Sequence, residues 1–305
     1  MISICIPTYN YNVEKLVSDL SQQCTEASTD FEIIVLEDGS DENHVAGNKS
    51  IENITGVKHI VNTENCGRSI TRNRLADMAK GEKLIFIDCD STIPDKQYIS
   101  RYLANCNYDV VCGGTTYNIS QYSPEISLRY TFGTKVEKST AAQRNQAPYS
   151  AFTTNNMMVS KKVFEKIRFC EALRKYGHED SLFGFDLQKN NIAILHIDNP
   201  VIHIGIESNE IFLAKTRASI ENLVAIRQME EISPDFFNHI RLHRHYAKLK
   251  KMCLLWTVKL TYKIWGKSIE NHLLKSKQPK LLIFNLYKLG YLCRKIKDEK
   301  KIRLN

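Results

Sequence analysis

The sequence has no CxxC pair and no Cys/His spacing typical of a zinc site. Its nine cysteines are scattered singly, which predicts reduced, mostly buried thiols rather than a disulfide framework. Met1 leads at once into an apolar run with no charged leader segment, and no apolar stretch reaches the roughly 20 residues that a membrane span requires. These absences predict a cytoplasmic protein without a transmembrane helix.

Two common nucleotide-binding motifs are also missing. A nicotinamide-binding sheet needs GxGxxG after its first strand, and a P-loop NTPase needs GxxxxGK[ST]. The chain has PTYN at the first of these places and lacks the second motif altogether. Both of these classes of doubly wound nucleotide binder are therefore excluded.

The chain is long enough for one large α/β domain with an appendage, or for two domains, at 305 residues. Its charge is unevenly divided. Residues 236–305 carry 18 Lys and Arg against 3 Asp and Glu, whereas residues 1–235 carry 24 against 31. The acidic part at 1–235 and the strongly basic tail at 236–305 are therefore expected to have different functions.

Strand-like and helix-like segments alternate through the first half of the chain. A continuous apolar run suits a strand buried on both faces, and apolar residues at helical spacing suit an amphipathic helix. The alternation predicts a parallel βαβ sheet with helices on both faces. The expected strands are 2–7, 33–36, 57–61, 83–87 and 109–112, and the expected helices are 13–23, capped by Asn12, then 68–79 and a segment near 94–105.

The run KLIFIDCDSTIPD at 83–95 contains a buried strand that ends at two acids. Strand alternation predicts Asp88 and Asp90 on one side and Cys89 on the other. Ligands of open α/β sheets bind beyond the carboxyl ends of strands, and paired carboxylates there suit Mg²⁺ or Mn²⁺ that carries phosphates. An ordinary strand end followed by an Asp/Ser turn is the alternative for an isolated DxD.

Four motifs together resemble the nucleotide-binding half of family 2 glycosyltransferases. They are PTYN at 7–10, EDGS at 37–40, NCGRSITRN at 65–73 and DCD at 88–90. Residues 154–190, from TNNMMV to the GHEDSLFGFDL segment, are similar to the acceptor-side half. The resemblance implies an inverting enzyme of GT-A fold that uses a nucleotide-sugar. It divides the chain into a GT-A domain at 1–207, with a donor half at 1–115 and an acceptor half at 116–207, and a basic helical region at 208–305.

The residues after the first strand are expected to contact the donor. Thr8, Tyr9 and Asn10 offer an aromatic ring for stacking on a base and an amide to bond it, although an ordinary β-turn is the alternative. By the resemblance, Asp38 would accept the imide N–H of a uracil-type base. Its neighbour Glu37 is expected to be solvated.

The helix after Gly67 contributes basic residues. Arg72 is expected to face the nucleotide or phosphates of the donor as a charge-assisted hydrogen-bond donor. Arg68 and Arg74 are expected to be surface charges.

The resemblance implies that Asp90 binds the metal directly and that Asp88 serves the ribose or a metal-bound water. His203 ends an apolar strand and is a further candidate ligand, with a purely structural role as the equal alternative. The expected cofactor is Mn²⁺ or Mg²⁺.

Glu179 and Asp180 begin a helix, where the positive end of the helix dipole keeps a carboxylate ionised. N-terminal capping alone would also favour acids there. With the resemblance, Asp180 is the expected general base and Glu179 an acceptor-binding residue.

The tail from 236 to 305 alternates basic and apolar residues at helical spacing, after an amphipathic helix at 209–230 and a break at Ser233-Pro234. Such helices fit an anionic membrane surface on the cytoplasmic side, and a helical bundle or a dimer interface is the alternative. No nucleic-acid-binding motif appears, so we expect no nucleic-acid partner.

The whole pattern predicts an inverting glycosyltransferase that moves a sugar from a nucleotide-sugar, with a UDP-sugar favoured, to a hydroxyl of a saccharide or lipid-linked saccharide in surface-glycan biosynthesis. A sugar-phosphate nucleotidyltransferase is one alternative, but it should carry a Gly-rich basic loop where this chain has PTYN. A nucleotide-sugar-binding scaffold without turnover is the other.

Overall fold

The computed structural model describes residues 1–118, 120 and 122–302, with side chains described as far as 296. The chain divides into two compact units, which we call the sheet unit and the helical unit. The sheet unit comprises Met1–Tyr117, Glu137–Arg174 and Glu179–Gly205. The helical unit comprises Asn118–Val136, Lys175–His178 and the chain from Ile206 onward. The change of unit at 205–206 lies next to the expected boundary at 207, but two segments of the expected acceptor half belong to the helical unit.

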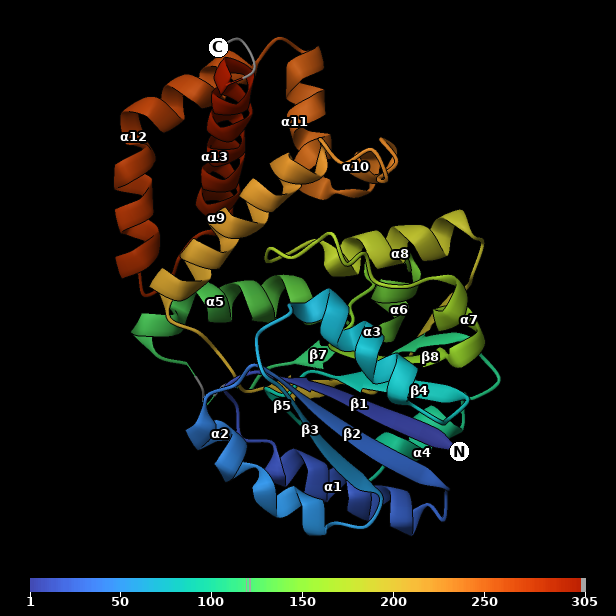
Figure 1. Cartoon of the computed structure of the whole chain (residues 1–305). Helices are drawn as coiled ribbons and strands as arrows, with labels where there is room; N and C mark the ends of the chain where they lie inside the picture. Colours follow the sequence, from blue (N-terminus) through green and yellow to red (C-terminus); the bar gives the residue numbers. More distant parts are fainter. Residues whose placement is uncertain (119, 121, 303–305) are drawn as a thin grey trace. The chain divides into compact units, whose positions relative to one another are not determined.

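The sheet unit contains a mixed seven-stranded sheet in the order β3-β2-β1-β4-β8-β6-β9 (Figure 1). β8 runs antiparallel to both of its neighbours, and the other neighbouring strands are parallel. The expected open, mostly parallel α/β sheet is thus confirmed, with β8 as the exception to an all-parallel arrangement. The strands are β1 (Ile2–Thr8), β2 (Phe31–Asp38), β3 (Val57–Asn62), β4 (Lys83–Ile87), β6 (Val110–Cys112), β8 (Asn156–Ser160) and β9 (Ile194–His196).

Successive residues of the central strands belong to different hydrophobic clusters. Ile4 and Ile85 lie in one cluster, with residues of α1 (Glu14–Glu26) and α4 (Tyr98–Leu103). Cys5 and Phe86 lie in the other, with residues of α3 (Arg68–Met78), α7 (Lys161–Lys166) and α8 (Glu179–Lys189). Figure 1 shows these two groups of helices on opposite faces of the sheet. Burial on both faces is the physical reason that the central strands are mostly apolar along their whole length.

A buried asparagine ties β8 to its surroundings. Asn156 Oδ1 accepts hydrogen bonds from the hydroxyls of Tyr98 and Tyr102 at 2.7 and 2.6 Å. Its Nδ2 donates to the carbonyl oxygens of Gly114 and Asn199, both at 2.8 Å. All four hydrogen-bonding positions of the amide are filled by protein groups, so the polar side chain is accommodated in the core.

A second, three-stranded sheet has the order β5-β10-β7. Its strands are β5 (Ser91–Thr92), β10 (Val201–His203) and β7 (Thr115–Thr116). β5 follows Asp90 directly, and β10 pairs antiparallel with it, with His203 opposite Ser91. The pairing brings the end of β10 next to the acids that follow β4.

Shorter helices complete the sheet unit, namely α2 (Glu42–Gly47), the 3₁₀ helix η1 (Lys49–Asn53) and α6 (Ala141–Asn145). The expected cap at Asn12 is one residue early, because Val13 occupies the cap position of α1. Asn12 Oδ1 nevertheless accepts a hydrogen bond from Glu14 N at 3.2 Å.

The helical unit is built mainly from residues after 205. Its helices are η3 (Pro124–Ile126), α5 (Ser127–Phe132), α9 (Asn209–Ile226), α10 (Phe236–His239), α11 (Arg241–Lys251), α12 (Leu255–Lys275) and α13 (Leu281–Ile302). The expected helix at 209–230 is present as α9. The tail from 236, expected to be helical, is divided by turns into α10, α11, α12 and α13.

The segment before α5 joins this unit through α9. Asn209, at the start of α9, accepts a hydrogen bond from Leu128 N at 2.8 Å and donates to the carbonyl oxygens of Pro124 and Leu274 at 3.0 Å. Leu128 packs in a cluster with residues of α9, α12 and α13. Of the helices in the part of the chain that the structure describes, none is both long and apolar enough to cross a membrane.

Candidate active site

Polar residues gather where β1, β2 and β4 end in the sheet unit. These neighbouring parallel strands end at Thr8, Asp38 and Ile87, and Asp88 follows the last of them. The carboxyl ends of parallel strands meet at one edge of a sheet, which is where ligands of open α/β folds bind. A ligand site is therefore expected among the side chains at this edge.

Arg72 of α3 lies at the centre of a cluster of carboxylates. Its Nη2 donates to Asp88 Oδ1 at 2.9 Å, and its Nη1 lies 3.9 Å from both Glu179 Oε1 and Asp180 Oδ1. The Arg72 side chain is only 2% exposed, and its guanidinium lies over the ring of Phe169. Burial opposes the positive charge, but the three carboxylates outweigh burial and raise the pKa of Arg72. The guanidinium is thus held charged, and it draws together acids that are distant in the sequence.

The two acids that begin α8 have opposite pKa shifts. Burial, and then the adjacent Glu179 carboxylate, raise the pKa of Asp180 to about 6. Burial also opposes ionisation of Glu179, but Arg68 and Arg72 outweigh it and lower the pKa of that carboxyl. Adjacent acids whose pKa values are driven apart are typical of sites that need one fixed charge and one proton acceptor.

Thr154 orients the carboxylate of Asp180. Its hydroxyl donates to Asp180 Oδ1 at 2.6 Å, from the residue two positions before β8. The Asp180 side chain remains 35% exposed, so a reacting group can reach it. Thr154 begins the TNNMMV segment, and the sequence pattern gave no role for it.

Asp90 and His203 form a second polar pair. His203 Nδ1 lies 3.4 Å from Asp90 Oδ1, and Ile204 N donates to the Asp90 carbonyl oxygen at 2.9 Å. Gly205 lies against the carboxylate, because a Cβ there would come within 2.7 Å of Asp90 Oδ2. The ladder between β5 and β10 brings these residues together across more than 100 positions of sequence.

The donor atoms of this pair suit a divalent cation. A carboxylate oxygen and an imidazole nitrogen both fit Mn²⁺, whose remaining positions phosphate and water oxygens fill. Among the described residues, no three His, Cys, Asp or Glu side chains form a group that could hold a metal ion. Asp88 accepts a hydrogen bond from Arg72. Its expected role, as a ligand of the ribose or of a metal-bound water, stays a prediction.

The alternation expected across 88–90 does not apply, because β4 ends at Ile87. Asp88 and Asp90 take different partners, Arg72 and His203. Cys89 packs against the hydrophobic cluster that contains α1. The expectation that Cys89 points away from the acids agrees with this packing.

Asp38 holds the loop that leads into α3. Its Oδ1 accepts from Cys66 N at 2.9 Å and its Oδ2 from Gly67 N at 3.0 Å. Gly39 has a φ of +73°, and a Cβ there would lie 2.4 Å from Asn65 N, so the loop approaches too closely for a side chain. Oδ1 also accepts from Asn62 Nδ2 at 3.3 Å, so the expected contact of Asp38 with a base, which stays a prediction, would use the second lone pair of Oδ2.

The residues after β1 have three different environments. Thr8 is buried and donates to the Ile6 carbonyl oxygen at 3.3 Å. Asn10 Oδ1 accepts from Asp41 N at 2.9 Å and so connects the turns after β1 and β2. Tyr9 is 54% exposed and is the residue of the three whose ring is available for stacking.

One expectation for a charged residue is wrong. Glu37 is not solvated, because it is fully buried and accepts hydrogen bonds from Asn48 Nδ2 at 2.7 Å and Ser40 Oγ at 2.5 Å. Arg68 is exposed, as expected, and its Nη1 also donates to Glu179 Oε1 at 3.4 Å. Arg74 is exposed, as expected. Nothing in the local sequence pattern distinguishes Arg68 from Arg74, since only the fold brings Glu179 near one of them.

The open, mostly parallel sheet flanked by helices is the fold of a class of sugar-transferring enzymes. Residues 3–168 match the family described as Glycosyl transferase family 2. The chain belongs to this family.

The individual proteins to which the chain is similar share only part of its sequence. The poly(ribitol-phosphate) beta-N-acetylglucosaminyltransferase TarP of Staphylococcus aureus (strain N315) is 26% identical over 199 residues, which are 62% of this chain and 58% of TarP. The chain thus spans less than two thirds of the length of this relative.

Solved structures extend the similarity to nearly the whole chain. The mannosyltransferase PcManGT from Pyrobaculum calidifontis, in complex with GDP-Man and Mn²⁺, is similar with a TM-score of 0.62 and 14% identity, over 96% of this chain and 86% of that one. S. aureus TarS 1–349 in complex with UDP-GlcNAc is similar with a TM-score of 0.51 and 20% identity, over 98% and 91%. At these identities the two structures bear on the fold alone, which is the expected GT-A fold.

Proposed function

We propose that this protein transfers a sugar from a nucleotide-sugar donor to a hydroxyl of a saccharide or lipid-linked saccharide acceptor, in the biosynthesis of a surface glycan. The observation that carries the proposal is the Glu179–Asp180 pair beside Arg72, with the pKa of Asp180 at about 6. A carboxylate with that pKa is mostly ionised at neutral pH and still basic enough to accept a proton. Family membership supports the same reaction class.

In the proposed reaction, Asp180 accepts the proton of the acceptor hydroxyl. The hydroxyl oxygen forms a bond to the anomeric carbon from the side opposite the leaving group. The bond from that carbon to the diphosphate oxygen breaks, and its electron pair leaves with the nucleoside diphosphate. One displacement without a covalent intermediate inverts the anomeric centre. Thr154 Oγ1 donates to Oδ1 of the base at 2.6 Å, and Glu179, kept ionised by the two arginines, would bind a sugar hydroxyl.

Donor recognition is proposed at the ends of β1, β2 and β4. The exposed Tyr9 ring would stack on the base, Asp38 would accept from it, and Asp88 would bond the ribose. A UDP-sugar is favoured because a carboxylate matches the imide N–H of uracil, and TarS has been solved with UDP-GlcNAc. PcManGT has been solved with GDP-Man, so the identity of the base is the part of the proposal that a donor screen decides.

A Mn²⁺ or Mg²⁺ ion would be held by Asp90 and His203 and, when bound, would neutralise the negative charge that develops on the departing diphosphate. The mannosyltransferase PcManGT has been solved with Mn²⁺. We expect Asp90→Ala to fold normally and to lose metal-dependent donor binding. Transfer at near wild-type rate by a folded Asp90→Ala protein would contradict this assignment.

The base is tested by Asp180→Asn, which keeps the shape of the side chain and removes its basicity. Transfer should fall by roughly 10²–10⁴, the usual contribution of a general base, while donor affinity changes only a few-fold. Asp186→Asn on the same helix is the matched control and should retain activity. Donor binding by the wild-type protein with no transfer and no donor hydrolysis would instead favour a scaffold without turnover.

A further inference from the structure

α12 exposes a row of large apolar side chains. Trp256, Leu260 and Ile264 are 64%, 48% and 58% exposed, and they follow one another at four-residue spacing along the helix. At 3.6 residues per turn, this spacing places them on one side of the helix. We call these three residues the apolar row.

A row of lysines lies beside it. Lys259, Lys263 and Lys267 also follow at four-residue spacing, and all three are exposed. Among the residues whose side chains are described, no carboxylate forms an ion pair with this lysine row. Glu270 lies at one end of the same region, and its Oε1 is 2.6 Å from Arg217 Nη1. The positive charge of the lysine row is therefore not paired with a carboxylate of the described part of the chain, and an anionic ligand can bind it.

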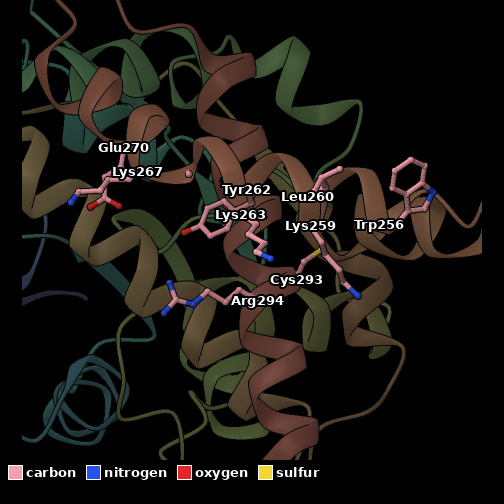
Figure 2. Close-up of a pocket in the computed structure, with 11 residues that line it drawn as sticks. Trp256, Lys259, Leu260, Tyr262, Lys263, Lys267, Glu270, Cys293 and Arg294 are labelled. Atoms are coloured by element: carbon pink, nitrogen blue, oxygen red, sulfur yellow. The ribbon is translucent and has the colours of Figure 1, made fainter.

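The lysine row, with Trp256 and Leu260 of the apolar row, borders a groove between α12 and α13 with a volume of about 780 Å³. Figure 2 shows residues that line it, with the lysine row, Trp256 and Leu260 contributed by α12 and Arg294 by α13. The helices approach closely at Gly290, where a Cβ would lie 2.3 Å from Tyr262 Cδ2. The groove combines positive charge with apolar surface. Such a surface suits a ligand that has an anionic group next to an apolar part.

The rest of α12 is committed to the helical unit. Val258 and Leu273 are buried, in clusters that include residues of α13. The bundle and the membrane surface were alternatives for the tail as a whole, and the structure separates the residues of α12 that pack in the bundle from those that stay exposed. The apolar groups of the bundle face are already covered, whereas the apolar row is not.

We propose that the apolar row and the lysine row of α12 form a docking face for an anionic lipid bilayer. The two rows match the phosphate layer and the acyl layer of an anionic bilayer. The ammonium groups of the lysine row would bind lipid phosphates, while Trp, Leu and Ile of the apolar row would enter the acyl boundary. Charge complementarity selects this occupant, since a second copy of the same face would bring two lysine rows together. The inference deepens the proposed function, because a lipid-linked acceptor would lie at the same surface, but its tests need no turnover.

The first experiment is flotation of the full chain with vesicles of phosphatidylcholine alone or with 40% phosphatidylglycerol. We expect binding only to the anionic vesicles and weaker binding as salt rises. Replacing the lysine row by glutamine should lower the affinity on the order of 100-fold, at about fivefold for each lysine. The matched control is Lys248→Gln, Lys250→Gln and Lys251→Gln on α11, which removes the same charge from exposed positions and should cost less than about tenfold.

The second experiment uses the two tryptophans of the chain, both of which lie on α12. Trp265→Phe leaves Trp256 as the reporter, and Trp256→Phe leaves Trp265, which the 3.6-residue turn places on the opposite side of the helix. On anionic vesicles the Trp256 emission should shift to the blue and resist acrylamide. The Trp265 emission should change little, although that residue is 55% exposed in the free protein.

Several results would overturn the proposal. They are equal recovery in the soluble fraction with both vesicle types at low salt, equal losses for the two glutamine variants, or equal shifts of the two tryptophans. A dimer in sedimentation that dissociates when the apolar row is changed to serine, without any vesicle binding, would assign the face to a second copy. Asp180→Asn should bind vesicles like wild type, so failure of the docking face and failure of the proposed reaction are distinguishable.

Discussion

Replacing Arg72 by methionine should raise the pKa of Asp180 above its value of about 6. Arg72 Nη1 lies 3.9 Å from Asp180 Oδ1, and the positive charge favours the ionised carboxylate. Two unit charges at about 4 Å interact by ~1 kcal/mol in bulk water and ~4 kcal/mol at an effective dielectric constant of 20. These energies correspond to roughly 0.7 to 3 pH units. Because the Asp180 side chain is 35% exposed, we expect the lower half of that range.

The assay is the pH profile of kcat/KM for transfer between pH 5 and 9. A base must be deprotonated to act, so wild-type activity should fall about tenfold for each pH unit below about 6 and level off above it. With Arg72→Met the carboxyl holds its proton to higher pH, so the whole rising limb should move toward pH 7 or above. Activity lost at pH 6.5 should return in large part at pH 9.

Arg72→Lys is the matched variant, because it keeps the positive charge and should leave the midpoint near that of wild type. Removing one partner of a buried ion pair typically costs ~3–5 kcal/mol of stability, so folding of both variants is checked first by circular dichroism and thermal unfolding. A midpoint for Arg72→Met that is unchanged, or that moves to lower pH, would refute the electrostatic role given to Arg72.

Three further predictions concern neighbouring parts of the sheet unit. Gly205→Ala should displace the Asp90 carboxylate and raise the Mn²⁺ concentration for half-maximal activity roughly tenfold or more. The control is Gly47→Ala, whose Cβ would meet only one atom at 3.9 Å and which should leave that concentration unchanged. Equal Mn²⁺ titrations of the two variants would contradict the prediction. Treatment with a chelator should abolish transfer, and Mn²⁺ should restore it; full activity in the chelated protein would rule out a metal-assisted reaction. Asn156→Ala should lower the free energy of unfolding by at least ~3 kcal/mol in urea titrations, because buried hydroxyls and carbonyls lose their partner, and a loss below ~1 kcal/mol would show that the network relaxes.

Much of the fold follows from local patterns in the sequence. The unbroken apolar run at 84–87 and the run at 2–6, which only Ser3 interrupts, identify strands buried on both faces, and both occur as central strands. Helices 68–79 and 209–230 agree with α3 and α9 to within four residues at each end. Strand ends are visible in sequence because apolar runs stop at turn-forming residues and acids, and this is why Asp38, Asp88 and Asp90 were recognisable as candidates.

The local sequence patterns do not predict the direction of each strand or which strands and side chains lie next to one another. β8 is antiparallel to β4 and β6, yet its apolar sequence is equally compatible with a parallel strand. The direction depends on how the long segment between β7 and β8 returns to the sheet. Likewise, His203 reaches Asp90 only because β10 pairs with β5.

The sequence by itself determined which residue types stand at the strand ends and which segments are buried, because burial leaves a local periodicity in the chain. Only the tertiary structure decided that Arg72 lies between Asp88 and the Glu179–Asp180 pair, and that the pKa values of those two acids separate. It also decided which face of α12 stays exposed. The physical reason is that charge interactions and packing depend on distances of a few ångströms between segments far apart in the sequence, and no local pattern records those distances.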